Sequence, residues 1–355
     1  MEESDENISD YMLNDFSSSN LGGKISSNQK KYLIIGGILL LIIIIIVILI
    51  IFLFTNKKTE NAPNIFGHIN CIYKKELHSS DEIQILGDSY EKNSNFDIYI
   101  DGKKIKFTKT YKFLDFEEHK IEFQLNETIN MKEMFKNVSS LISVEMISNK
   151  NCIISSLIGS FENCINLESF KIEGFNVENI KSLEKTFYNT KIKSTDLKIF
   201  NNSQIEDISY MFALCPLEKF NFSTIDFSSI KNMSHLFENC SSLEEIEIPS
   251  SINLDKLEDM SYMFRGCESL VSLDLSNFVQ TINLKDMSHI FQDCILLNSI
   301  DLSNLNTISV KDMSFVFQGC NSLKILDITN FETNNVENME NMFKLCNSLI
   351  EIKLI

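Results

Sequence analysis

Cysteine is the residue type in this chain with the clearest potential for chemistry. A metal site needs three or four converging ligands, often from Cys-x₂-Cys pairs, and the sequence contains no such pair. A disulfide ladder needs Cβ atoms that converge, whereas equivalent positions of stacked repeats point in parallel. We therefore expect buried free thiols that act as small core residues. Seven cysteines share one position of a repeated phrase: Cys164, Cys215, Cys240, Cys267, Cys294, Cys320 and Cys346.

Other reactive residue types form no recognisable catalytic set. Cys71 and Cys152 lie outside the repeat phase and could pair with each other in an oxidising compartment, a question that the sequence leaves open. The five histidines form no i, i+4 pair and no partnership with a nucleophile. His235 and His289 share one repeat position, and we expect both to be solvated. We therefore expect no enzyme activity, no cofactor and no metal, with a hydrolase as a remote third hypothesis.

The cysteines belong to a phrase that is written nine times, and this repetition predicts a solenoid. Successive copies are 25 to 27 residues apart, a period at which each unit buries its apolar side by stacking on its neighbours. We expect the phenylalanine of each copy to lie in the core with Cys240, Cys267, Cys294 and Cys320. The phenylalanines are Phe135, Phe161, Phe187, Phe212, Phe237, Phe264, Phe291, Phe317 and Phe343.

Each phrase predicts a short helix followed by a short strand. Five residues before every phenylalanine stands Asn, Ser or Asp, a residue type that caps helices, as at Asp259. The next residue is apolar, and with the phenylalanine and the cysteine it gives the spacing i, i+4, i+7 of one helical face. An alternating segment such as Leu270 to Leu275 then indicates a strand with one buried side. The expected fold is a right-handed α/β solenoid of leucine-rich-repeat type.

Strand alternation places a row of polar residues on the open face of the predicted parallel sheet. Glu247, Asp274, Asp301 and Asp327 form an acidic stripe along it, and serines flank them at the neighbouring positions. Such a row is either a solvated face that keeps the sheet soluble or a docking strip for a basic or hydroxyl-rich ligand. The candidate ligand-facing strip comprises Glu247, Asp274, Asp301, Asp327, Ser272, Ser276, Ser299 and Ser303.

The N-terminal third has a different organisation. Residues 1–31 predict a disordered acidic tail, because they hold too little apolar surface to offset the entropy of ordering. The apolar run 33–54 is long enough for a transmembrane helix over 32–55 and longer than the apolar part of a cleavable signal peptide. A polar linker over 56–64 and a small antiparallel β domain over 65–128 follow. Asp101 and Gly102 between alternating segments predict a hairpin, and we expect this domain to cap nine repeats over 129–355.

The repeat phrase is similar to that of the BspA-type leucine-rich repeat surface proteins. The segment 237–249 carries that family's Phe-x-x-Cys-x-x-Leu-x-x-Ile-x-Ile-Pro pattern, and Asp274, Leu275, Ser276 and Phe278 carry its Leu-Asp-Leu-Ser-x-Phe form. The resemblance covers residues 130 to 355. It implies a cell-surface or secreted display protein whose repeats mediate adhesion or recognition. The pattern includes no catalytic residues, so the resemblance assigns none here.

The expected function is that of a single-pass, membrane-anchored surface protein with its C-terminal ectodomain outside the cell. Expected partners are the lipid bilayer, through 33–54, and an unidentified protein or glycan ligand on the sheet face. A net charge of −17 argues against nucleic acid. The last strand lacks a closing unit, so a partner at the C-terminal end is a further expectation. Lysines flank the apolar run almost equally, which leaves a membrane-tethered intracellular scaffold as the alternative.

Overall fold

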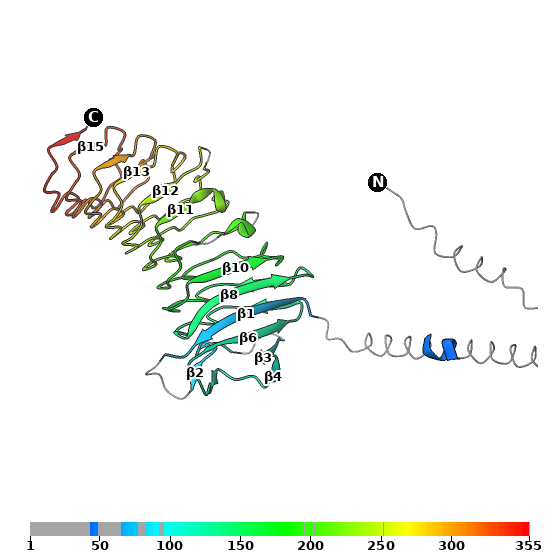
Figure 1. Ribbon diagram of the computed structural model, residues 1–355. Coiled ribbons are helices and arrows are strands. Elements are labelled where there is room, and N and C mark those ends of the chain that lie inside the picture. The colour runs from blue at the N-terminus through cyan, green and yellow to red at the C-terminus, as the bar shows by residue number, and fades with distance from the viewer. Residues whose placement is uncertain are drawn as a thin grey trace, which may run out of the picture. The chain divides into compact units, whose positions relative to one another are not determined.

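The structure, a computed structural model, describes residues 43–48, 65–76, 82–91, 96–194, 196–201, 204–250 and 252–354. The chain divides into two units, Met1–Pro63 and Asn64–Ile355. The second unit is a stack of similar layers that begins at a β-sheet and ends at the C-terminus (Figure 1). The predicted tail over 1–31 and the predicted linker over 56–64 lie outside the described residues.

The stack begins with a small antiparallel sheet. Strands β3 (Phe96–Ile100) and β4 (Lys103–Ile105) form the predicted hairpin, and Asp101 and Gly102 in its turn both have positive φ. Strand β6 (Glu118–Leu125) pairs with β3 and with β1 (Gly67–Lys74), antiparallel in both cases. A separate short pair joins β2 (Ile83–Gln84) to β5 (Thr110–Tyr111). Alternate residues of β1, β3 and β6 are buried, so one face of this sheet packs on the core.

The β domain continues directly into the first repeats. Strand β8 (Leu141–Ser148) pairs antiparallel with β1 on one side and parallel with β10 (Ser169–Glu173) on the other. One six-stranded sheet therefore runs in the order β10-β8-β1-β6-β3-β4. A second short pair, β7 (Thr128–Asn130) with β9 (Ile153–Ser156), is parallel. This shared sheet covers the apolar layer that the first repeat would otherwise expose.

Later repeats contribute one short strand each. These strands form parallel pairs, β11 (Lys219–Asn221) with β12 (Glu245–Glu247), β13 (Ser272–Asp274) with β14 (Ser299–Asp301), and β15 (Ile325–Asp327) with β16 (Glu351–Lys353). Two 3₁₀ turns occur in this region: η1 (Lys198–Phe200) lies between β10 and β11 in sequence, and η2 (Phe222–Thr224) directly follows β11. Between β10 and β11 the described residues of the third repeat form no strand, so the sheet is interrupted there.

The predicted helices of the α/β solenoid are absent from the described repeats, and that fold prediction is wrong. The molecule is a β-solenoid in which each phrase forms a chain of tight turns. In the sixth repeat, for example, the backbone N–H groups of Met260, Tyr262, Phe264 and Gly266 donate to carbonyls of the seventh repeat at 2.8 to 3.0 Å. Tyr262 and Gly266 have positive φ, which no α-helix allows. The apolar residues at i, i+4 and i+7 are still buried, because the chain of turns buries the same positions that a helix would bury.

The capping residues serve turns instead of helices. At all nine positions the side chain accepts a hydrogen bond from the backbone N–H two residues later, as Asp259 does from Ser261 at 2.8 Å. Asp, Asn and Ser favour such turns as strongly as they favour helix N-termini. The residue type alone could not distinguish the two structures.

The core is a continuous column of stacked side chains. The nine phenylalanine rings lie face to face at centroid distances of 5.5 to 6.3 Å, with interplanar angles of 4 to 21°. Eight are buried and Phe343, in the last layer, is half-buried. At the other end Phe123 of β6 meets Phe135 edge-on at 5.7 Å. The column therefore joins the β domain to all nine repeats.

The prediction of a transmembrane helix is not supported by the described residues. Among them, no helix is both long and apolar enough to cross a bilayer. Ile43–Ile48 are helical, and the rest of the predicted span over 32–55 lies outside the described part of the chain.

Candidate functional site

The acidic strip lies on the open face of the short strands. Glu247, Asp274, Asp301 and Asp327 end β12, β13, β14 and β15, and all four are exposed. Ser272 and Ser299 begin β13 and β14 on the same face and are exposed as well. Ser276 and Ser303 follow the strands in the turns, where Ser276 is half-buried. The eight residues thus line one face of the solenoid.

Three of these carboxylates have a structural role that the sequence did not reveal. One oxygen of each accepts a hydrogen bond from a backbone N–H two residues later, Asp274 from Ser276 at 2.8 Å, Asp301 from Ser303 at 2.9 Å and Asp327 from Thr329 at 3.2 Å. Hydrogen bonds from Ser276 lower the pKa of Asp274. Hydrogen bonds from Thr329, and to a smaller extent the one from Lys353, lower the pKa of Asp327. The strip carboxylates therefore close turns as well as face solvent.

Turn closure accounts for the residue shape but not for the negative charge. In β11 the equivalent residue is Asn221, whose side-chain oxygen accepts the same bond from Ser223 at 2.8 Å. An uncharged amide therefore closes this turn equally well. Two other carboxylates of the row are paired with lysines, since Lys171 lies 3.5 Å from Glu145 and Lys353 lies 3.3 Å from Asp327.

Asp274 and Asp301 have no such balance. They are opposite each other in the parallel register of β13 and β14, and no cation pairs with either among the described residues. Like charges directly opposite on neighbouring strands are destabilising. The chain therefore keeps two adjacent carboxylates at a cost in stability where asparagine would close the turns.

A shallow hollow continues the strip toward the C-terminus. Its volume is about 440 Å³, and carboxylate, hydroxyl and amide groups dominate its walls. These groups accept hydrogen bonds readily, and two of them carry negative charge, which suits lysine or arginine side chains. The lining residues include Ser299, Asp301, Ser303, Asp327, Thr329 and Asn330.

Sequence reasoning missed a row of stacked rings on the turn side of the solenoid. Neighbouring rings are 4.0 to 4.4 Å apart between centroids and within 10° of parallel. Every residue of this ring ladder has positive φ, near 56 to 59°. The two histidines are half-buried between ring faces, so they are less solvated than expected. The ladder comprises Tyr210, His235, Tyr262, His289 and Phe315.

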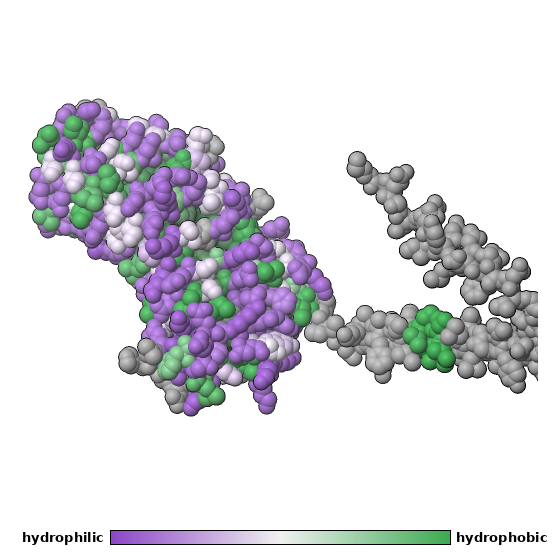
Figure 2. All heavy atoms as spheres, in the orientation of Figure 1, coloured by the Kyte–Doolittle hydropathy of each residue, from purple (hydrophilic) through white to green (hydrophobic). Residues whose placement is uncertain are grey.

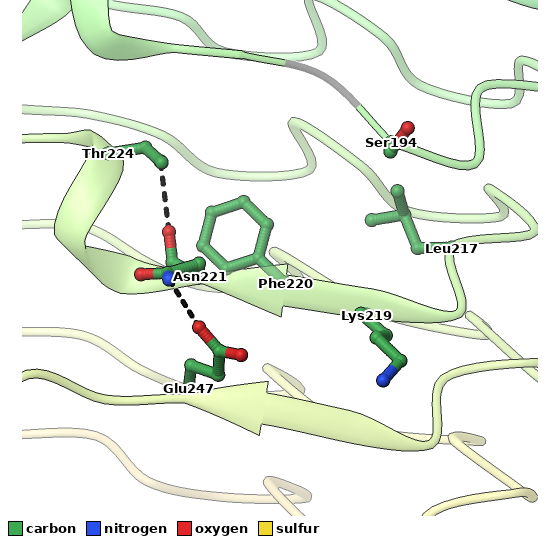
Figure 3. A pocket seen from close by; sticks show the side chains of 7 residues that line it. All are labelled: Ser194, Leu217, Lys219, Phe220, Asn221, Thr224 and Glu247. Atoms are coloured by element: carbon green, nitrogen blue, oxygen red, sulfur yellow. Dashed lines mark hydrogen bonds between the residues drawn. The ribbon is translucent and has the colours of Figure 1, made fainter.

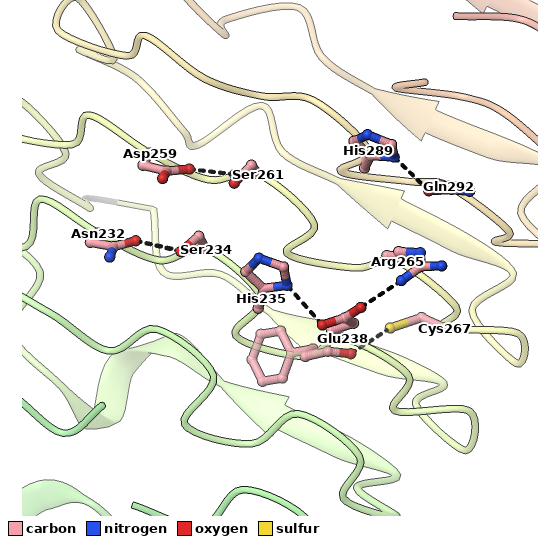
Figure 4. A network of polar contacts seen from close by, with 11 residues as sticks. Asn232, Ser234, His235, Glu238, Asp259, Ser261, Arg265, Cys267, His289 and Gln292 are labelled. Atoms are coloured by element: carbon pink, nitrogen blue, oxygen red, sulfur yellow. Dashed lines mark hydrogen bonds and ion pairs between the residues drawn. The ribbon is translucent and has the colours of Figure 1, made fainter. Parts of the chain in front are cut away.

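A half-buried carboxylate, that of Glu238, joins two residues of this ladder (Figure 4). Glu238 accepts hydrogen bonds from His235 and from Arg265, each at 2.7 Å, and the Arg265 guanidinium also lies over the Tyr262 ring. Burial raises the pKa of Glu238, but the bonds to His235 and Arg265 outweigh it, so the pKa falls below the ordinary 4.5. The carboxylate stays charged and links two successive repeats.

The cysteines of the repeat are free and six of the seven are buried. Each thiol donates to the backbone carbonyl of the phenylalanine one repeat earlier, as Cys294 does to Phe264 at 3.1 Å. Burial raises the pKa of Cys294 to about 12. Cys71 and Cys152 are buried and carry no bridge. No group of three or more potential metal ligands occurs in the part of the chain that the structure describes.

The C-terminal layer exposes apolar side chains. Met339, Leu345, Ile350 and Leu354 are 50 to 81% exposed. Figure 2 shows apolar residues gathered at this end of the stack. The predicted partner at this end stays a prediction.

These features define the class of protein. Repeats of 25 to 27 residues, all with a phenylalanine in the stacked column, seven of nine with a cysteine beside it and all but the third with a short strand, form a BspA-type leucine-rich-repeat solenoid. The chain belongs to the family DUF285, described as "Mycoplasma protein of unknown function", whose model matches residues 105–223, 155–278, 216–299 and 258–352.

Comparison with solved structures gives a distant likeness. A leucine-rich repeat protein from Bacteroides ovatus ATCC 8483 is 17% identical, with 69% of this chain and 67% of that chain covered and a TM-score of 0.33. No curated protein matches the chain.

Proposed function

We propose that the chain is a non-enzymatic recognition protein whose sheet face binds a protein ligand through basic side chains. The adjacent carboxylates of Asp274 and Asp301 are the observation that carries this proposal. Their negative charge is not needed to close the turns and is unfavourable between neighbouring strands. A cationic partner would compensate this charge on binding. The ligand's lysine or arginine groups would relieve the repulsion on binding.

The position of the strip supports binding along several repeats at once. Neighbouring strands of a sheet are about 4.8 Å apart, so successive carboxylates offer regularly spaced contacts. Each exposed ion pair contributes little, in the range of about 0.2 to 1 kcal/mol, and affinity requires several together. Binding should therefore be strongly salt-dependent. As part of the same proposal the repeats act outside the cell, which the resemblance to surface proteins supports.

The test compares two triple variants of the full-length protein with equal net charge. One carries Asp274→Asn, Asp301→Asn and Asp327→Asn, which keep the turn-closing oxygen and remove the strip charge. The other carries Glu117→Gln, Glu268→Gln and Glu332→Gln at exposed positions away from the strip. The probe is a decalysine peptide, and its affinity is measured by calorimetry at two salt concentrations.

We expect the strip variant to bind decalysine about tenfold more weakly than the parent and the control variant to bind nearly as well as the parent. Equal weakening by both triple variants would mean that only net charge matters, and the proposal would fail.

A separate experiment tests whether the repeats lie outside the cell. Protease added to intact cells that produce the protein should cut within 65–355 if the repeats lie outside. Complete protection of the repeats, with cutting only after lysis, would instead favour the intracellular scaffold.

A further inference from the structure

The interruption of the sheet leaves a hollow of about 180 Å³ beside β11 (Figure 3). The third repeat is one residue short of most others, and its described residues at 192–194 form no strand. A second hollow lies at the equivalent position of β14 and β15, but there Ile300 stands in place of Phe220 and the floor has no aromatic ring. The residues that line the hollow beside β11 are Ser194, Leu217, Lys219, Phe220, Asn221, Thr224 and Glu247.

The floor of this hollow is apolar and rigid. Leu217 and Phe220 are both buried. The Phe220 ring packs against Phe212 and Phe237, with centroids 5.6 and 4.9 Å away, and therefore has little freedom to move. Such a floor offers a flat apolar contact to one face of a small ring.

The rim is polar and already organised. The Asn221 side chain accepts from the Ser223 N–H at 2.8 Å and donates from Nδ2 to Glu247. The Thr224 hydroxyl donates to the Asn221 carbonyl at 2.9 Å. These bonds hold the amide and the carboxylate in place beside the opening, where Figure 3 shows them. Fixed polar groups lower the entropy cost of binding a ligand.

The charge of the rim excludes anionic ligands. Lys219 pairs with Glu245 on the neighbouring strand. Glu247 adds a negative charge that no described cation pairs with. A phosphate or carboxylate would therefore meet net repulsion, whereas a neutral ligand with several hydroxyl groups can donate to Glu247 and exchange hydrogen bonds with Asn221 and Ser194.

We propose that this hollow binds one neutral sugar ring of hexose size. A volume of about 180 Å³ corresponds to about six waters, room for a single ring and not for a chain of rings. The C–H face of the ring rests on Phe220, which Leu217 supports from below, and its hydroxyl groups reach Glu247, Asn221 and Ser194. The inference is independent of the proposal for the acidic strip, with which it shares only Glu247.

The experiment uses the full-length protein with the methyl glycosides of glucose, mannose and galactose and with N-acetylglucosamine. Saturation-transfer NMR detects binding, and calorimetry measures its affinity. Glu247→Gln retains an acceptor for Asn221 but loses the charge. Asn221→Asp still closes the turn, as Asp274 does, but loses the amide donor. Glu268→Gln changes an exposed residue outside the hollow and the strip and is the control.

At least one of the four sugars should bind, and Glu247→Gln and Asn221→Asp should each weaken its binding about tenfold while Glu268→Gln leaves its binding unchanged. Circular dichroism establishes that the variants are folded. Absence of saturation transfer from all four sugars would overturn the inference, as would binding that neither hollow variant affects. The sugars are neutral, so their binding does not depend on the charge of the acidic strip. The sugar test and the decalysine test can therefore succeed or fail independently.

Discussion

At the scale of single residues, Glu238 shows how a buried charge can join two repeats. Its side chain is only 14% exposed, yet His235 and Arg265 hold it in the ionised form. Leaving a buried carboxylate without these partners would be costly. The pair of bonds therefore makes the packing of these two layers depend on the charge of one residue.

This dependence predicts a pH effect on stability. Because the pKa of folded Glu238 is below its ordinary 4.5, its stabilising contribution is present above pH 4.5 and is lost as the pH falls through the folded value. Urea unfolding between pH 3 and 6 should therefore show a steeper loss of stability for the parent than for Glu238→Gln. Glu268→Gln, at an exposed position, should follow the parent. Parallel pH curves for all three proteins would contradict this account.

The cysteines show which features of a single residue can be predicted from the sequence and which cannot. The sequence predicts buried free thiols at the repeat position, and the structure places free thiols there, six of the seven buried. The bond from each thiol to a carbonyl of the preceding repeat has no signature in spacing. It depends on where the backbone of another layer runs, which single-residue patterns do not contain.

At the scale of the repeated element, the helix prediction failed for a definable reason. Cap residue types and the i, i+4, i+7 apolar spacing are shared by helices and by this chain of turns. The decisive positions are those with positive φ. The second of them in each repeat carries Asn, Asp or Gly in seven of nine cases, as at Asn239 and Gly266, and those types favour that conformation.

The first positive-φ position offers no such signal. In the ring ladder it carries tyrosine and phenylalanine, which rarely adopt this conformation, and histidine, which adopts it more often than they do. The ladder and the Glu238 contacts therefore could not be read from the sequence. The strip could be located, because strand alternation alone decides which residues face outward.

Stacking in the phenylalanine column predicts that replacing different phenylalanines with alanine lowers the free energy of unfolding by different amounts. Phe264 is fully buried between Phe237 and Phe291, with centroid distances of 5.6 and 5.9 Å. Phe264→Ala should lower the free energy of unfolding by about 3 to 5 kcal/mol. Phe343 stacks on one neighbour in the described layers and is half-buried, so Phe343→Ala should cost clearly less. Urea denaturation measures both, and equal losses would argue against the column as the main source of stability.

At the scale of the whole molecule, each layer contacts its neighbours and little else, so stability should be close to a sum over repeats. Removing residues 260–286 would join Asp259 to Met287 and place Phe237 against Phe291 in unbroken phase. We expect the shortened protein to keep its circular dichroism spectrum and to unfold cooperatively at lower denaturant concentration.

The control for this deletion removes the same segment and one further residue, Met287. That change shifts every later position relative to the stack, so we expect loss of cooperative unfolding. If both deletions behaved alike, the layers would not depend on their register.

The direction of the bonds between layers gives the solenoid an electrical polarity. On the turn side, amide N–H groups such as those of Met260, Tyr262 and Phe264 all point toward the C-terminal neighbour, and the carbonyls that receive them point back. Their dipoles add along the axis, as they do in a helix but with the opposite sense. Partial positive charge should accumulate at the last described turn, where an approaching anion is favoured, and partial negative charge at the β domain.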